Sequence, residues 1–284
     1  MPERPDLEYV VPILDRETRG LTIAAVEVRK PVVLRLTVAG TPEALLCGRR
    51  IGSVRRRAHF VVFALDGDAP LEIAVNPMLA GRFALEPGRS RARTDVALAL
   101  SLSDGRVLRY RDDVQMGKVY VIARGAWTKV PGLQTIGVDV LDQRLFTLAK
   151  LRELARQRRD QVKVFLMDKS VIDAFGNAYA DEVLWEARIH PKKMARGLDD
   201  DELDRLHRAI VGVLRNACDT IRRRKPPLDE KLRDFLNVRG RAGEPCRRCG
   251  TKLRRARVRA DDSIFCPQCQ PDVRGTSIVD WRKL

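Results

Sequence analysis

The sequence lacks the features that would assign it to a membrane or to export. No run of about 18 apolar residues, the length that a membrane-spanning helix needs, occurs among its 284 residues. The first eight residues, Met-Pro-Glu-Arg-Pro-Asp-Leu-Glu, are polar and unlike a signal or transit peptide. No internal repeat is evident. We therefore expect a cytoplasmic protein without a membrane partner.

The sequence also has fewer acidic residues than basic ones. The 38 Asp and Glu are outnumbered by 54 Lys and Arg, which gives a formal charge of +16 at pH 7 and a pI near 10.1. A surplus of this size favours a polyanionic partner such as nucleic acid. With 44% hydrophobic residues, the chain has enough apolar surface for two domains and a small metal-binding module.

Cysteine is rare, and four of the six cysteines form two closely spaced pairs. Cys246 and Cys249 form one C-x-x-C pair, and Cys266 and Cys269 form the second after sixteen intervening residues. This spacing is typical of a closed tetrahedral zinc site, so we expect one structural Zn²⁺ held by four thiolates. Two disulfides or buried free thiols are the alternatives, although nothing in the sequence indicates export to an oxidising compartment.

The residues between the two cysteine pairs have the length of a two-stranded hairpin. Its basic residues are Lys252, Arg254, Arg255, Arg257 and Arg259. Residues 239–284 hold twelve Lys and Arg against five Asp and Glu, a balance of +7, which favours docking on a polyanion. We interpret the remaining cysteines, Cys47 and Cys218, as packing residues rather than as a disulfide.

The apolar pattern changes along the chain. Residues 7–24 have the apolar spacing of a helix, and residues 21–120 contain short β-favouring runs separated by turns. After Gly132 the pattern becomes helical, most clearly over 203–221, where apolar residues recur at i, i+3, i+4 and i+7. The sequence therefore predicts a β-sandwich or barrel, then helices, then a Pro-, Gly- and Arg-rich linker at 224–245.

The second residue gives the N-terminus a distinct chemistry. The initiator Met1 is normally removed before a small residue, so the mature chain should begin with the secondary amine of Pro2. An α-amino group titrates at about pH 8, so much of this amine is neutral and nucleophilic at physiological pH. The adjacent Glu3 is placed to transfer protons. From these residues alone, a frayed terminus without function is the competing interpretation.

Residues 165–191 closely resemble the helix-two-turn-helix signature of the formamidopyrimidine-DNA glycosylase and endonuclease VIII family of DNA repair enzymes; they read FLMDKSVIDAFGNAYADEVLWEARIHP. Met-Pro-Glu at the N-terminus and Gly-Glu-Pro-Cys at 243–246 match the same family in order. The resemblance covers nearly the whole chain and implies an α+β fold. Its parts are an N-terminal catalytic β-sandwich domain with flanking helices (1–131), a helical helix-two-turn-helix DNA-binding domain (132–235), and a C-terminal zinc-finger β-hairpin with a tail (236–284).

The resemblance also implies a function. Enzymes of this family remove oxidised or ring-opened bases, which are extruded from the duplex because C1′ is unreachable within the stack. Pro2 would then attack C1′ to form an imine, and Glu3 would carry protons. Lys163 and Asn177 would bind phosphates. Met78 would fill the space left by the flipped base, although its own pattern is that of a core residue.

Several positions depart from the family pattern. His59 stands where the family commonly has a lysine near the damaged nucleotide; it can bind phosphate or act as an acid, or serve as a structural residue at the start of a strand. Asp261 stands where the hairpin usually presents an arginine, so we expect Arg257 or Arg259 to contact phosphate instead. Residues 112–117 replace the usual aromatic-Gly loop with its arginines.

We therefore expect a monomeric, bacterial-type, nucleoid-associated DNA glycosylase and abasic-site lyase that acts on double-stranded DNA. Pro2, Glu3 and His59 are the expected catalytic residues. The expected DNA contacts are Arg57, from the arginine cluster at 49–57, and Met78, Lys163, Asn177, Arg257 and Arg259. The alternative is a protein of the same family that binds damaged or abasic DNA without turning it over.

Overall fold

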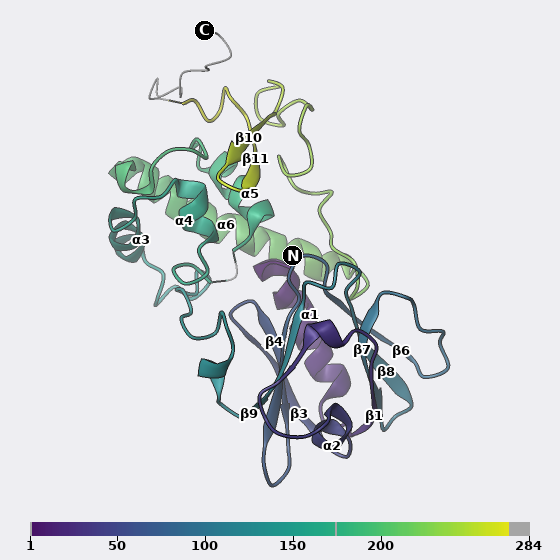
Figure 1. The fold of residues 1–284 in the computed structure, drawn as a ribbon. Helices are drawn as coiled ribbons and strands as arrows, with labels where there is room; N and C mark the ends of the chain where they lie inside the picture. The colour runs from purple at the N-terminus through teal and green to yellow at the C-terminus, as the bar shows by residue number, and fades with distance from the viewer. Residues whose placement is uncertain (1, 174, 273–284) are drawn as a thin grey trace. The chain divides into compact units, whose positions relative to one another are not determined.

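The computed structural model describes residues 2–173 and 175–272 (Figure 1). The chain forms two compact units. The first consists of residues up to Gly137 together with Asn216–Leu232, and the second consists of Val138–Arg215 together with the described residues from Arg233 onward. Each unit is therefore built from two separate stretches of sequence. Within the described residues, each helix is either too short or too polar to cross a bilayer.

The first unit contains two β-sheets (Figure 1). One is antiparallel, with the strand order β1-β7-β8-β6; the other has the order β2-β9-β5-β4-β3 and is antiparallel except for the β2–β9 pair. The strands are β1 (Ile23–Val28), β2 (Leu34–Leu36), β3 (Ile51–Arg57), β4 (Phe60–Leu65), β5 (Leu71–Asn76), β6 (Arg82–Pro87), β7 (Val96–Leu102), β8 (Arg106–Arg111) and β9 (Lys118–Ala123).

Both sheets contribute to one hydrophobic core. Phe63 of β4 and Ile73 of β5 belong to the same buried cluster as Leu98 of β7 and Leu108 of β8. This shared core makes the first unit a β-sandwich, as the sequence predicted. The short helices α2 (Pro42–Leu46), η1 (Pro31–Val33) and η2 (Trp127–Lys129) lie in its connections.

Helix α1 (Arg4–Thr18) packs on strand β3 and adds Leu7 and Leu14 to the core. The helix begins earlier and ends earlier than the predicted range of 7–24. It begins at Arg4 because Glu3 and Asp6 form a capping box, in which each side chain accepts the other's backbone N–H. Gly20, which adopts a φ of 83°, follows the helix end and turns the chain toward β1.

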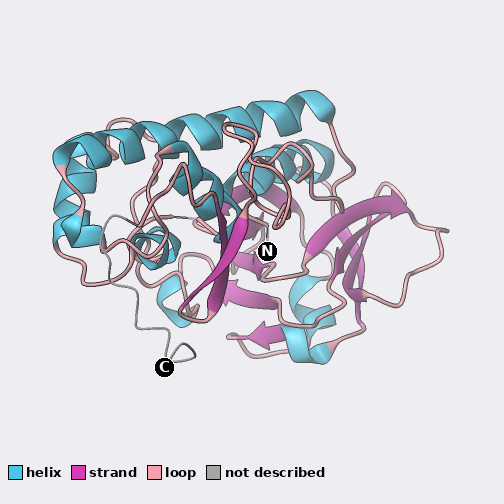
Figure 2. Ribbon diagram, turned by 90° about the horizontal axis from the view of Figure 1, so that it is seen from above, coloured by secondary structure: helices cyan, strands magenta, loops and turns pink. Residues whose placement is uncertain are grey.

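The second unit is helical, with a small hairpin (Figure 2, helices cyan and strands magenta). Its elements are α3 (Leu148–Arg156), α4 (Val162–Met167), α5 (Asn177–Glu186), η3 (Ala195–Gly197), the larger part of α6 (Asp200–Arg224), β10 (Arg254–Val258) and β11 (Asp261–Phe265). Helix α6 has acidic residues in its first turn and arginines in its last, which suits the helix dipole. Its predicted apolar stripe is buried, as at Leu206 and Ile210.

Helix α5 is buried along most of its length, and this includes two carboxylates. Asp181 and Glu182 expose 1% and 2% of their surface. The Glu182 carboxylate accepts the backbone N–H groups of Asn237, Val238 and Arg239 at 2.7–2.9 Å. Burial nevertheless raises the pKa of Glu182, against the lowering effect of these hydrogen bonds. This carboxylate therefore ties the segment that leads into the zinc module to α5.

Candidate active site and nucleic-acid interface

Pro2 lines a cavity of the first unit, immediately before α1. The cavity is small and partly open to solvent, and its walls come from α1, from the loop after β5 and from residues 228–231. The other lining residues are Asp6, Leu7, Val10, Pro77, Gly81, Arg82, Phe83, Leu228, Asp229, Glu230 and Lys231. Glu3 caps α1 and is 5% exposed, so its carboxylate is held in place next to Pro2. The expected removal of Met1 concerns a residue outside the described ones.

Residues 228–231 form one wall of this cavity, and the segment 226–231 is anchored to the rest of the first unit. The Tyr9 hydroxyl donates to the Pro226 carbonyl at 2.8 Å, Arg111 forms an ion pair with Asp229, and the Lys231 ammonium donates to the Leu79 carbonyl at 3.0 Å. The sequence indicated only a linker here. Its one signal was Leu228, an apolar residue within a Pro-rich and charged stretch, which packs on the core.

His59 and Arg57 lie at the turn between β3 and β4. His59 is 5% exposed, and its ring centroid lies 4.7 Å from that of Phe60. The ring also lies so close to Gly132 that a Cβ added there would be 3.4 Å from Nε2. His59 is not among the residues that line the Pro2 cavity. The guanidinium of Arg57 stacks on Trp127 at 4.7 Å and is partly exposed.

Met78 lies at the tip of the loop after β5. The loop is held by the Asn76 side chain, which accepts the Met78 N–H at 3.1 Å, and Met78 adopts a positive φ of 44°. Met78 is half-buried, and the adjacent Leu79 is 54% exposed. An apolar tip on a constrained backbone is suited to insertion between bases. The role of Met78 stays a prediction from the family resemblance, and the adjacent exposed Leu79 was not predicted, although two apolar residues side by side in a turn are a sequence signal.

A second loop, 112–117, presents apolar side chains as well. Val114 and Met116 are 52% and 41% exposed. The buried carboxylate of Asp112 accepts the N–H groups of Val114, Gln115 and Gly117 at 2.6–3.2 Å, which fixes the loop backbone. Val114 and Leu79 line the same open groove of the first unit. Both loops thus present exposed apolar residues, and in loop 112–117 these stand where the family resemblance led us to expect an aromatic residue and arginines.

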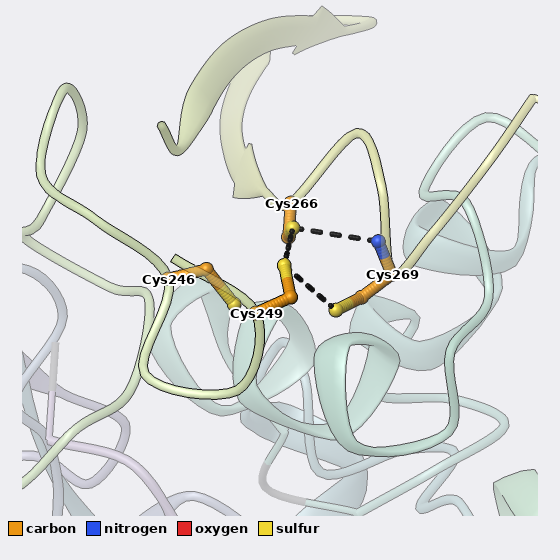
Figure 3. Close-up of side chains that lie close together, drawn as sticks. All are labelled: Cys246, Cys249, Cys266 and Cys269. Atoms are coloured by element: carbon orange, nitrogen blue, oxygen red, sulfur yellow. Dashed lines mark hydrogen bonds between the residues drawn. The ribbon is translucent and has the colours of Figure 1, made fainter. Parts of the chain in front are cut away.

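The four predicted zinc ligands come together in the second unit (Figure 3). Their sulfur atoms all lie within 4.8 Å of one another, and Cys249 Sγ is 3.4 Å from the Sγ atoms of Cys266 and Cys269. Four thiolates around one Zn²⁺ would be spaced at about 3.8 Å, given Zn–S bonds of about 2.3 Å. The arrangement therefore fits one structural zinc ion, as predicted, and four protein ligands leave no position for a reactant. Its role is to cross-link the two knuckles that flank the β10–β11 hairpin.

Lys163 is buried and lies in a compact charge cluster of the second unit. Its side chain is 0% exposed, and its ammonium donates to Asp181 Oδ1 at 2.7 Å and to the backbone carbonyl of Asp262. Burial lowers the pKa of Lys163, and the attraction of Asp181 offsets this only in part. The contact of Lys163 with a phosphate stays a prediction, and the partners of the ammonium in this structure are internal.

Asn177 begins α5, and its side-chain amide already has an anionic partner. The amide donates to Asp262 Oδ1 at 3.3 Å, and Arg239 Nη2 approaches the same oxygen at 3.2 Å. Burial raises the pKa of Asp262, but Arg239 and Asn177 outweigh this effect and hold the pKa below its usual value. Asp262 thus stays ionised in contact with the predicted phosphate ligand. A contact between residues 85 positions apart could not be predicted from one sequence.

The hairpin arginines also have partners within the second unit. Arg259, at the hairpin tip with a φ of 52°, forms an ion pair with Asp160. Arg257 Nε donates to the Arg259 carbonyl at 3.1 Å, and its side chain is exposed. Asp261 is exposed and opens β11. Of the two arginines expected to replace the usual one, Arg259 is therefore paired with a carboxylate, whereas Arg257 forms no ion pair within the part of the chain that the structure describes.

Comparisons with known proteins agree with this architecture. Residues 1–119 match the formamidopyrimidine-DNA glycosylase N-terminal domain, residues 136–224 match the H2TH domain of the same enzymes, and residues 243–271 match the zinc finger found in FPG and IleRS. The chain is 35% identical over 283 residues to the formamidopyrimidine-DNA glycosylase of Heliobacterium modesticaldum, with coverage of 95% of this chain and 100% of the relative. For that of Pelotomaculum thermopropionicum, the identity is 32%, with coverage of 95% and 99%.

Solved structures of formamidopyrimidine-DNA glycosylases are also similar to this chain. The Lactococcus lactis Fpg in complex with DNA containing an abasic site superimposes with a TM-score of 0.86 at 25% identity, covering 95% of this chain and 100% of that one. The MutM (Fpg) protein of Thermus thermophilus superimposes with a TM-score of 0.81 at 31% identity, covering 95% and 98%. These matches extend over both units.

Proposed function

The chain belongs to the formamidopyrimidine-DNA glycosylase family, and on this premise we propose that Pro2 is the nucleophile of a base-excision-repair DNA glycosylase with abasic-site lyase activity. The observation that carries the proposal is the position of Pro2. It lines a cavity and directly precedes Glu3, whose carboxylate is fixed by the capping box at the start of α1. An N-terminal secondary amine so placed needs only the removal of Met1 to become nucleophilic.

The proposed reaction follows from these two residues. The Pro2 amine attacks C1′ of an extruded damaged nucleotide, the base leaves, and opening of the sugar ring gives an iminium. The ring oxygen takes up a proton as the sugar opens, and Glu3 is the adjacent carboxyl that supplies it. The iminium then acts as an electron sink, so that loss of a proton from C2′ expels the neighbouring phosphate. The zinc ion takes no part in these steps.

Duplex DNA with damaged bases or abasic sites is the proposed substrate, and several exposed side chains support this. Met78, Leu79 and Val114 are apolar residues on constrained loops, which suits them to fill the space of an extruded base. Partly exposed Arg57 and exposed Arg257 are cations available to phosphates. His59 and Lys163 are 5% and 0% exposed, and a catalytic role for His59 and a phosphate contact for Lys163 stay predictions from the family resemblance.

Borohydride trapping on duplexes that contain an abasic site, an oxidised guanine or an oxidised pyrimidine tests this proposal. Wild-type protein whose Met1 has been removed should form a covalent adduct, because borohydride reduces the iminium to a stable amine. Pro2→Gly and Glu3→Gln should lose the adduct, whereas Pro5→Ala, in the same helical turn, should retain it. An adduct that persists in Pro2→Gly would rule out Pro2 as the nucleophile.

The same experiment addresses the alternative of binding without turnover. That alternative is favoured by one observation, the Asp262 carboxylate in contact with Asn177. Tight and selective binding of abasic DNA by the wild type, without any adduct, would establish it. Mass spectrometry of the mature protein is a further check, since a retained Met1 would block the Pro2 amine.

A further inference from the structure

The charge cluster around Asp262 is balanced within itself. Lys163 and Arg239 are its cations, and Asp181 and Asp262 are its anions. Leaving aside Arg255, which approaches Asp262 only to 3.9 Å from the exposed hairpin, these two positive and two negative charges sum to zero, so this group of four has no net charge to offer a phosphate. If the Asp262 side chain turns away, the remaining charge is +1, which matches one backbone phosphate. The state of Asp262 therefore decides whether this part of the second unit attracts DNA.

The contacts of Asp262 divide into a fixed part and a movable part. Its backbone carbonyl accepts from Lys163 Nζ and from Arg239 Nη1, which anchors β11 to the cluster. Its carboxylate is bound by the Asn177 amide and by Arg239 Nη2 at 3.2–3.3 Å, and 39% of the side chain is exposed. Rotation of the side chain alone would leave the backbone contacts in place and open the position between Asn177 and Arg239.

A second place for the carboxylate exists on the hairpin itself. Arg255 Nε lies 3.9 Å from Asp262 Oδ2, and Arg257 is the direct cross-strand partner of Asp262 in the β10–β11 register. Both arginines are exposed. Cross-strand neighbours on one face of a hairpin are within reach of each other's charged groups. The carboxylate can therefore exchange one cation for another without becoming unpaired.

We propose that Asn177 and Arg239 form a binding site for a DNA backbone phosphate, and that Asp262 occupies this site as an internal competitor which must turn toward the hairpin arginines before DNA binds. The inference rests on the proposed function, since it takes DNA as the ligand. It gives a binding role to Arg239, a residue of the segment between α6 and the hairpin. Asp262 would thereby set the affinity for DNA rather than provide a contact to it.

The test compares Asp262→Asn with Asp261→Asn. The two variants remove the same charge from adjacent hairpin positions, but only Asp262 contacts Asn177 and Arg239. Affinity for a duplex carrying a tetrahydrofuran abasic-site analogue is measured by fluorescence anisotropy over a range of salt concentrations. We expect Asp262→Asn to bind at least about tenfold more tightly than the wild type. Asp261→Asn should gain no more than about twofold, because its charge is exposed and screened.

Arg239 is tested in the Asp262→Asn background. Adding Arg239→Gln should abolish the gain in affinity and reduce the slope of log K against log salt by about one. Arg241→Gln in the same background is the matched control, because Arg241 bonds Glu244 and the Asn237 carbonyl instead. Equal affinities of Asp262→Asn and Asp261→Asn would overturn the proposal. So would a gain that survives Arg239→Gln, since the effect would then be one of general charge.

Separate controls distinguish a change in DNA affinity from a folding defect and from a loss of catalysis. Zinc content and thermal unfolding are checked for each variant, and Asp262→Ser, judged by the same criteria, replaces Asp262→Asn if that variant does not fold. Borohydride trapping on abasic DNA reports on Pro2 independently. Trapping by the wild type with equal binding of the two Asp variants would refute only the competitor role, whereas selective tightening without trapping would refute only the enzymatic proposal.

Discussion

The indole Nε1 of Trp185 donates a hydrogen bond to the Sγ of Cys246 over 3.3 Å. Trp185 belongs to α5, and Cys246 is the first of the four zinc ligands, so the bond joins the helix to the metal site. The guanidinium of Arg248 lies 3.9 Å from the Trp185 ring, and Arg248 Nη1 donates to the Trp185 carbonyl at 2.9 Å. The first knuckle is therefore held on α5 by several contacts around one side chain.

Replacement of Trp185 by Phe should accelerate zinc release. A hydrogen bond to a coordinating thiolate orients the ligand and spreads its charge, and loss of such support typically weakens metal binding by about tenfold or more. Release to a chromophoric chelator measures the effect directly. Trp127→Phe is the control, since Trp127 belongs to the first unit and stacks on Arg57. Identical release from the two variants would show that the indole N–H does not support the site.

Gly117 should not tolerate a methyl group. A Cβ at this position would lie 1.8 Å from the Tyr110 hydroxyl and 2.7 Å from Asp112 Oδ2, so the loop that presents Val114 and Met116 must shift. We expect Gly117→Ala to cost at least about 2 kcal/mol of unfolding free energy, measured by urea denaturation. In a Tyr110→Phe background, where the hydroxyl is absent, the cost should be smaller. An equal cost in both backgrounds would place the clash elsewhere.

Asp95 should make the stability of the first unit depend on pH. Two hydrogen bonds from Arg111 Nε, at 3.1 Å, and Nη2, at 2.7 Å, hold the pKa of Asp95 below its ordinary 3.8, against the effect of burial. A carboxyl with a depressed folded-state pKa contributes stability that is present above pH 3.8 and lost as pH falls through the folded-state pKa. Asp95→Asn should therefore cost about 1.5 kcal/mol at pH 7.

That cost should shrink as the pH falls below 3.8. Urea denaturation of the wild type and the variant at matched pH values measures it. Asp113→Asn, which removes a carboxylate that is 57% exposed, is the control and should show little difference at any pH. Loss of zinc in acid affects all three proteins alike. A cost for Asp95→Asn that stays constant down to pH 3 would contradict the assigned pKa direction.

Local patterns allowed part of the fold to be predicted. The zinc ligands follow from the C-x-x-C spacing, and α6 follows from its apolar stripe, because in both cases the interacting residues are close in sequence. The burial of strand β8 could not be predicted, for the opposite reason. Its Arg109 and Arg111 expose 4% and 3% of their surface, yet arginines in a short run indicate solvent. They are buried because Glu86, Asp95 and Asp229 neutralise them, and those partners are distant in the sequence.

In the candidate site, too, the residues that could be predicted are those whose signal is local in the sequence. Pro2 and Glu3 are recognisable because they are adjacent and begin the chain. The positions of Lys163 and Asn177 depend on partners 18 and 85 residues away, which no local pattern specifies. Residues 226–231 have the composition of a linker, and only the structure shows that Pro226, Asp229 and Lys231 anchor this segment and that residues 228–231 line the cavity.

The discontinuity of the first unit limits how this protein can be divided. A polypeptide that ended at residue 137 would keep both β-sheets and Pro2 but would lose Leu228 and Asp229, which line the cavity beside that proline, and Pro226, which anchors their segment to Tyr9. Arg111 would then be left without one of its two carboxylate partners in the interior. The sheets and the segment that follows α6 must therefore be inherited together, and recombination between related genes at this boundary should yield proteins in which the cavity around Pro2 is incomplete.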